Sequence, residues 1–211
     1  MSNILPLFPL RLVAFPAERL NLHIFEPRYK QLINECHAKG TTFGIPAFIE
    51  DRVQSIGTEM ELLGIEKTHA NGEMDVRTKA KGIFRIVEFW EKMEDRLYSA
   101  AEIERLTFDV EGDFLKNERI LELLAELYDV LQIRKPLPEH SPDFNTFKIA
   151  HVSGLTIEQE YELLCIPEEL RRQEFMLQHL EKLLPMAKEL EELRLKVQMN
   201  GHFKNILPPK V

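Results

Sequence analysis

Four basic residues recur along one short segment of the chain in an arrangement that could bind phosphate groups. The segment 74–90 is typical of a β-strand, whose side chains alternate between two faces. All four have odd numbers and would form a stripe on one face: Arg77, Lys79, Lys81 and Arg85. Such a stripe could neutralise the phosphates of RNA, unless acidic side chains on adjacent strands neutralise it first. RNA binding is therefore one function that the sequence leaves open.

The sequence motifs of common enzyme and metal sites are missing. A phosphate-binding P-loop needs Gly-Lys-Thr or Gly-Lys-Ser, whereas residues 39–41 are Lys-Gly-Thr. The seven histidines are scattered, and the Cys-His pair at 36–37 is too close in sequence to supply two tetrahedral metal ligands. His-Val-Ser-Gly at 151–154 lacks the leading glycine of a Gly-x-Ser-x-Gly nucleophile turn. We therefore predict no catalytic residue, no metal site and no cofactor; an enzyme would need a pocket that the sequence does not reveal.

Acidic residues crowd the beginning of the last predicted helices. They are Glu158, Glu160, Glu162, Glu168 and Glu169. Paired carboxylates can serve acid–base catalysis, but acidic side chains also favour helix N-termini because they complement the helix dipole. We interpret the cluster as a solvated helix surface.

The composition is that of a globular protein with an acidic balance. The 211 residues include 27 Lys and Arg against 35 Asp and Glu, which gives a net charge of −8. This balance argues against a general binder of nucleic-acid backbones. Cys36 and Cys165 fit neither a disulfide framework nor a paired metal motif, so we predict reduced thiols and a cytoplasmic location. No apolar stretch reaches the roughly 18 residues of a membrane span, so no membrane association is expected, and Pro6, Pro9 and Arg11 argue against a signal peptide.

The first half of the chain predicts a small sheet with one helix. Strands are expected at 5–8, 20–25, 42–49, 56–68, 74–90 and 97–106. A helix is expected from Pro27 to Gly40, because Tyr29, Leu32, Ile33 and Cys36 recur at helical spacing. The Asn71-Gly72 pair predicts a type I′ hairpin turn between two of the strands. About six strands and one helix suggest a curled sheet or partly closed barrel.

The second half predicts helices only. Asp113 is a plausible N-cap, Thr156 and Gln159 have the spacing of a capping box, and a long helix after Pro167 is expected to be kinked or split at Pro185. The fold class is therefore α+β. We expect a barrel domain at 1–108, a helical bundle at 113–205 and a tail at 206–211.

The barrel half also carries a family signal. It consists of Leu-Pro-Leu-Phe-Pro-Leu at 5–10, Phe-Pro at 15–16, Leu-Asn-Leu-His-Ile-Phe-Glu-Pro-Arg-Tyr at 20–29, Phe-Gly-Ile at 43–45, Ile-Gly-Thr at 56–58, Asn-Gly at 71–72 with Asp-Val at 75–76, and Gly-Ile-Phe-Arg-Ile at 82–86. In this order the motifs resemble the opening of the N-terminal substrate-binding domain of the Lon ATP-dependent proteases. The second half is similar to the helical bundle that follows the barrel in that family.

The resemblance implies a PUA-like β pseudobarrel with one covering helix, followed by an all-α bundle. It also implies a stand-alone module without the ATPase and protease domains of the full proteases. The expected function is non-catalytic binding of unfolded or tagged polypeptide segments, as an adaptor in proteolysis or protein quality control that works with a separate protease.

Four residues are candidates for peptide binding: Glu26, Arg28, Tyr29 and Trp90. The first three stand at the beginning of the predicted helix, where backbone N–H groups and a charged pair could meet an incoming chain. Their alternative role is structural, because they could cap the helix and fix it against the barrel. Trp90 follows Phe89 on one strand, so alternation directs only one of the two rings inward.

Overall fold

The computed structural model of the chain describes residues 3–93, 95–138 and 144–203; the predicted tail at 206–211 lies outside them. The chain divides into two compact units. The first contains the residues up to Asp109 together with Ala150–Glu168, and the second contains Val110–Ile149 and the residues from Glu169 onward. The helix pattern of the sequence assigns residues 150–168 to the second domain, whereas in the structure they cluster with the strands.

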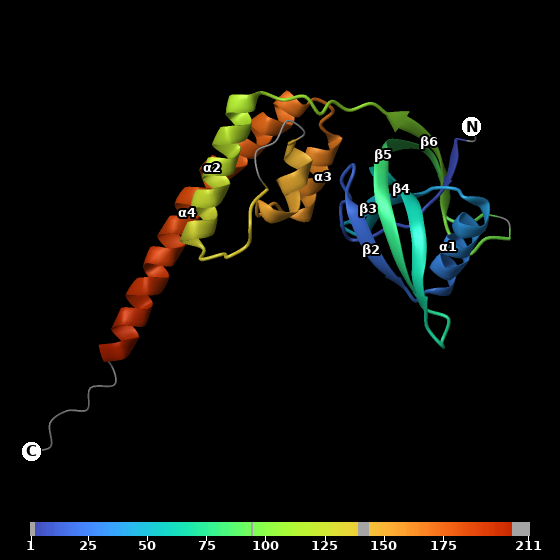
Figure 1. Ribbon diagram of the computed structural model, residues 1–211, viewed down its shortest axis with the longest axis horizontal. Helices are drawn as coiled ribbons and strands as arrows, with labels where there is room; N and C mark the ends of the chain where they lie inside the picture. Colours follow the sequence, from blue (N-terminus) through green and yellow to red (C-terminus); the bar gives the residue numbers. More distant parts are fainter. Residues whose placement is uncertain (1–2, 94, 139–143, 204–211) are drawn as a thin grey trace, which may run out of the picture. The chain divides into compact units, whose positions relative to one another are not determined.

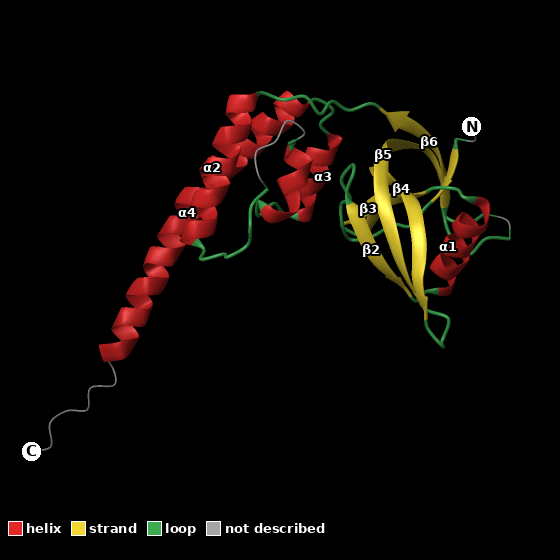
Figure 2. Ribbon diagram, in the orientation of Figure 1, coloured by secondary structure: helices red, strands yellow, loops and turns green. Residues whose placement is uncertain are grey.

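The first unit is built on one antiparallel sheet of six strands (Figures 1 and 2). The strands are β1 (Ile4–Pro6), β2 (Arg19–Ile24), β3 (Phe43–Ile49), β4 (Arg52–Thr68), β5 (Met74–Trp90) and β6 (Ala100–Leu106). Their order is β1-β6-β5-β4-β3, and β2 pairs with β5 beside this path. Strand β5 is central, because β4 pairs along one of its edges while β2 and then β6 pair along the other.

The segment that follows β1 joins the two ends of the strand order. Leu7 bridges to Gly44 and Leu10 bridges to Ala47, both in parallel with β3. The amide of Phe48 donates a hydrogen bond of 2.7 Å to the carbonyl of Leu10. These contacts close the sheet into the partly closed barrel that the strand pattern predicted.

Helix α1 (Pro27–Lys39) contributes its apolar face to the core of the barrel. Proline at the first helical position suits the helix start, and Gly40 ends the helix with a φ of 62°, a left-handed value that glycine adopts without strain. The buried face consists of Tyr29, Leu32, Ile33 and Cys36, as predicted. Full burial of one such aliphatic side chain stabilises the fold by about 1.5–3 kcal/mol.

The prediction of a type I′ turn at Asn71-Gly72 is wrong. That turn requires positive φ at both residues, and only Gly72 has one, at 76°. The amide of Gly72 donates to the carbonyl of His69, and the amide of His69 donates to the carbonyl of Glu73, so three residues lie between this bonded pair. Both φ angles are positive at Glu50 and Asp51, which join β3 to β4. The two-residue turn therefore occurs where the sequence has no Asn-Gly signal.

A second core cluster forms around the ring of Phe84. It contains Leu5, Leu7, Phe84, Ala101 and Ile103, all buried. Gly44 and Gly57 allow the Phe84 ring to approach the backbone, because a Cβ at either glycine would lie 2.7 Å from its Cζ atom. Glycine is therefore required at these two positions for packing.

The described helices of the second half are α2 (Phe114–Val130), the 3-10 helix η1 (Thr146–Val152), α3 (Ile157–Cys165) and α4 (Glu169–Phe203). Asp113 caps α2, and Thr156 with Gln159 forms the predicted capping box of α3, which belongs to the first unit. Helix α4 continues through Pro185 as one element. Among the described residues, no helix has both the length and the apolar composition that a membrane span requires.

Helices α2 and α4 lie side by side and run in the same direction (Figure 1). Lys116, in the first turn of α2, pairs with Glu174 near the start of α4, and Glu126 pairs with Lys188 further along both helices. The amide side chain of Gln173 joins their starts, because its Nε2 donates to the Asp113 carbonyl at 2.9 Å.

The interpretation of Glu169 as a solvated carboxylate is wrong. Its side chain is fully buried and forms an ion pair of 2.7 Å with the equally buried Arg172. The amide of Thr146 donates a further hydrogen bond of 2.8 Å to the same carboxylate. Burial raises the pKa of Glu169 against the opposing effect of these partners. The helix start therefore holds an internal polar network.

Candidate functional site

A groove with both apolar and polar walls lies within the first unit, where the beginning of α1 meets the ends of several strands. We call it the aromatic groove, and its volume is about 300 Å³. Its lining consists of Pro9, Arg28, Tyr29, Phe48, Val53, Phe89, Glu91, Leu97 and Ser99. Helix α1, strands β3, β4 and β5 and the loop before β6 all contribute, so the closed sheet fixes the groove's shape.

The groove combines a fixed ring with exposed apolar side chains. Tyr29 is 6% exposed, and its ring stacks on Phe8 with a centroid distance of 3.7 Å. Burial raises the pKa of Tyr29, which keeps the phenol neutral. Phe89 and Leu97 remain 40% and 59% exposed. Exposed apolar side chains beside a packed ring can bury an incoming apolar side chain with little rearrangement.

Charged side chains border this apolar surface. The guanidinium carbon of Arg28 lies 4.6 Å from the centroid of the Tyr29 ring. Arg28 also forms an ion pair of 2.8 Å with Glu26, which occupies the N-cap position of α1 without capping it through its side chain. Arg28 is therefore oriented by two neighbours. Glu26 itself does not line the groove.

The structure separates Trp90 from the other candidate residues. Trp90 lies in a different hollow with Ile4, Lys92 and Met93, and its indole Nε1 donates to Glu88 at 3.1 Å. Its neighbour Phe89 lines the aromatic groove instead. Alternation along β5 therefore separates the two rings, and only Phe89 joins Arg28 and Tyr29.

Among the residues of the aromatic groove that sequence reasoning missed are Phe48, Val53 and Leu97. Phe48 and Val53 are cross-strand partners in β3 and β4, and Leu97 comes from the loop before β6. Each is an ordinary apolar residue of a strand or loop, so only the strand register brings them together. No sequence signal identifies them.

A larger hollow of about 970 Å³ lies beside β1 and the end of α1, and we call it the charged hollow. Glu59 is 8% exposed there and accepts two hydrogen bonds from the guanidinium of Arg105, at 2.7 and 3.0 Å. Burial opposes ionisation of Glu59, but hydrogen bonds from Arg105 and Thr42 outweigh it and lower the pKa of this carboxyl. Glu59 is therefore held ionised rather than poised as a proton donor.

A second network in the charged hollow is built around Glu35. Its carboxylate pairs with Arg96 and Lys39 and accepts a hydrogen bond from the Tyr98 hydroxyl at 3.1 Å. Burial together with the hydrogen bond to Glu35 raises the pKa of Tyr98 to about 12. Burial opposes ionisation of Glu35 too, but bonds from Lys39 and Tyr98 lower its pKa. The two acidic residues of the hollow are thus engaged in ion pairs.

The four residues of the basic stripe are exposed on β5. The register of β5 against β4 shifts at this point. Ala80 and Gly82 pair with adjacent residues of β4, and Lys81 between them has no partner residue on that strand. Such an extra residue interrupts the alternation of faces. Odd numbering therefore does not place Arg85 on the same face as Arg77.

Acidic residues on neighbouring strands pair with two members of the stripe. Arg77 lies 2.7 Å from Glu66, and Arg85 lies 3.2 Å from Glu104. These pairs reduce the positive potential that an RNA backbone would meet. Lys79 and Lys81 are the remaining members.

Comparisons with known proteins agree with this fold. The family model described as the ATP-dependent protease La (LON) substrate-binding domain matches residues 4–182. The crystal structure of a Lon N-terminal domain protein from Xanthomonas campestris is similar at 25% identity and a TM-score of 0.63, over 82% of this chain and 96% of that one. The N-terminal domain of the Mycobacterium avium complex Lon protease shares the fold at 16% identity and a TM-score of 0.62, over 84% and 98% of the two chains. The comparison with curated proteins gives no match.

Proposed function

The chain belongs to the family of Lon protease substrate-binding domains, and from this premise we propose that it binds unfolded or tagged polypeptide segments through the aromatic groove. The observation that carries the proposal is the exposure of Phe89 and Leu97 beside the buried ring of Tyr29. In this role the domain recognises a polypeptide and catalyses no reaction on it.

The size of the groove supports recognition of side chains rather than of a folded surface. A volume of about 300 Å³ is at the lower end of ligand pockets. Burial of one large apolar side chain stabilises a complex by about 1.5–3 kcal/mol, which corresponds to about tenfold or more in affinity. A segment would therefore bind with modest affinity, as expected for a module that must also release its client.

The proposal includes an adaptor role, in which the domain presents its client to a separate protease. It also includes a cytoplasmic location, in keeping with Cys36 and Cys165, which are both free cysteines. The adaptor role predicts that a protease co-purifies with the protein more strongly when an unfolded client is present.

Binding of a permanently unfolded polypeptide tests the proposal. The probe is a fluorescently labelled protein that has been reduced and carboxymethylated, so that it stays unfolded without denaturant. We expect the chain to retain this probe over its folded, unmodified form. We also expect the variants Phe89→Ala and Leu97→Ala to weaken retention about tenfold, because each removes one apolar contact.

Val87→Ala provides the matched control. Val87 also lies on β5 and is 63% exposed, but it does not line the aromatic groove. Retention by this variant should equal that of the wild type. Equal retention of folded and unfolded probe, or equal losses in all three variants, would overturn the proposal.

A further inference from the structure

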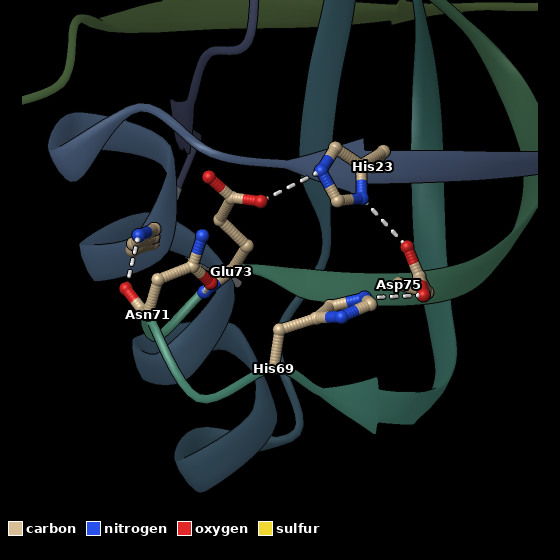
Figure 3. A network of polar contacts seen from close by, with 6 residues as sticks. His23, His69, Asn71, Glu73 and Asp75 are labelled. Carbon is tan, nitrogen blue, oxygen red and sulfur yellow. Dashed lines mark hydrogen bonds and ion pairs between the residues drawn. The ribbon is translucent and has the colours of Figure 1, made fainter.

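Two histidines and a carboxylate meet on the surface of the barrel, and none of the three lines the aromatic groove (Figure 3). His23, His69 and Asp75 each offer a metal-ligating atom, and these atoms lie within 4.8 Å of one another. Asp75 connects the two rings, because its Oδ1 lies 2.7 Å from Nδ1 of His23 and its Oδ2 lies 2.8 Å from Nε2 of His69.

The strand register positions this cluster. His23 on β2 is the direct partner of Asp75 on β5. On the other side of β5, Asp75 pairs with Lys67 of β4, and His69 follows two residues later. His69 lies one residue beyond the end of β4, where its amide donates to the carbonyl of Glu73 at 2.8 Å, so two ligands lie on paired strands and the third lies at the base of the hairpin loop. Hydrogen-bonded strands therefore fix the backbone positions of His23 and Asp75, and the hydrogen bond to Glu73 fixes that of His69.

Glu73 completes the arrangement as a neighbour of His23. Its carboxylate oxygen lies 3.1 Å from Nε2 of His23, on the side of the ring opposite to Asp75. The amide of Glu73 donates to the side chain of Asn71, which fixes the hairpin loop (Figure 3). Metal-binding histidines commonly donate their second ring nitrogen to a carboxylate, which sets the tautomer and directs the other nitrogen to the metal. Glu73 is placed to accept a hydrogen bond from Nε2 of His23, which directs Nδ1 of His23 to the metal.

We propose that His23, His69 and Asp75 form a binding site for a divalent transition-metal ion such as Zn²⁺, with Glu73 orienting His23. Two imidazoles and one carboxylate are a ligand set that suits Zn²⁺ better than Mg²⁺ or Ca²⁺. A tetrahedral zinc ion holds its ligand atoms about 3.3 Å apart, so small side-chain rotations bring the present atoms into place. The three side chains are 31–48% exposed, which gives an ion access and leaves the fourth position to water or an outside ligand.

The site is tested by titrating the full chain, free of any affinity tag and previously treated with a chelator, with Zn²⁺ in a calorimeter. We expect one Zn²⁺ per chain at this site, with no competition from Mg²⁺. The double variant His23→Gln with His69→Gln should bind Zn²⁺ at least about tenfold more weakly. Glu73→Ala should weaken binding by about tenfold while leaving one ion per chain, because it removes only the orienting partner.

Co²⁺ provides a spectroscopic readout of the same site. Binding to the wild type should produce the visible absorption of tetrahedral Co²⁺, and the double variant should lack it. His37→Gln is the matched control, because His37 is exposed on α1 and belongs to no such cluster among the residues that the structure describes. Unfolding curves in chelator show whether each variant is folded. Failure of the wild type to bind Zn²⁺, or binding that the double variant retains unchanged, would overturn the proposal.

Discussion

Nδ1 of His151 lies 2.8 Å from a carboxylate oxygen of Glu160. The other ring nitrogen, Nε2, faces Glu18 at 3.2 Å, and the ring packs against Phe15 at a centroid distance of 5.0 Å. Hydrogen bonds to Glu160 and Glu18 raise the pKa of His151 from 6.5 to about 10. Since all four residues belong to the first unit, the charged imidazole links η1, α3 and the loop before β2 within it.

The stability supplied by His151 should depend on pH. Because the pKa is higher in the folded chain, the contribution is complete below pH 6.5, falls as the pH rises and is lost above about pH 10. Urea unfolding of the wild type and of His151→Gln should therefore differ most near pH 6 and converge toward pH 10. Trp90 is the only tryptophan, so its fluorescence reports on the first unit. A difference that is constant with pH would contradict the assignment.

Gly57 should not tolerate even a methyl group. In Gly57→Ala the new Cβ would meet the Phe84 ring and the Pro46 backbone, each at 2.7 Å. Overpacking of this kind lowers the free energy of unfolding by about 1–3 kcal/mol. Gly64→Ala, on the same strand, has no neighbour within 4 Å of the new Cβ and should stay within about 0.5 kcal/mol of the wild type. Urea unfolding followed by Trp90 fluorescence measures both, and equal effects would contradict the packing argument.

Arg172→Leu should destabilise the second unit strongly. The substitution leaves the Glu169 carboxylate buried without its partner, which costs about 3–5 kcal/mol. It also removes the guanidinium that lies 4.2 Å from the Phe147 ring. The exposed neighbour Arg171 provides the control, since Arg171→Leu should change stability by about 0.5 kcal/mol or less. Far-UV circular dichroism during urea unfolding measures the stability of both variants. Similar losses of stability would contradict the predicted cost of breaking the buried pair.

RNA should bind weakly. Two members of the basic stripe are paired with acidic residues, and the whole chain carries a charge of −8. We therefore expect no retention of single-stranded RNA at physiological salt in a filter-binding assay. The double variant Lys79→Glu with Lys81→Glu should behave as the wild type. Retention that falls with salt and disappears in this variant would support RNA binding instead.

Local patterns predicted the elements whose structure is decided locally. Helix α1 follows from Pro27, Gly40 and an apolar face that recurs at helical spacing, and the start of α2 follows from Asp113. The β4–β5 hairpin was also predicted, although its turn type was not. The hairpin depends on two apolar strands that any short loop can join, whereas the turn type depends on the backbone angles of Asn71 and Gly72.

Contacts between residues that are distant in the sequence determine the features that the sequence alone did not predict. Glu169 has the pattern of an exposed first-turn carboxylate, and only Thr146 and Arg172 make it internal. His23 and His69 are far apart in the sequence, and the pairing of β2 with β5 brings them to the same carboxylate. Positions of this kind follow from strand register and packing, for which a single sequence carries no direct signal.

The bridges from Leu7 to Gly44 and from Leu10 to Ala47 have a consequence for the proposed binding of unfolded chains. An open strand edge would offer its amides and carbonyls to any extended client and so promote β-aggregation with it. Closure between the segment after β1 and strand β3 occupies backbone groups at both ends of the strand order. Under the proposed function, the domain would hold a client by its side chains while these strands are protected from adding it to their own sheet.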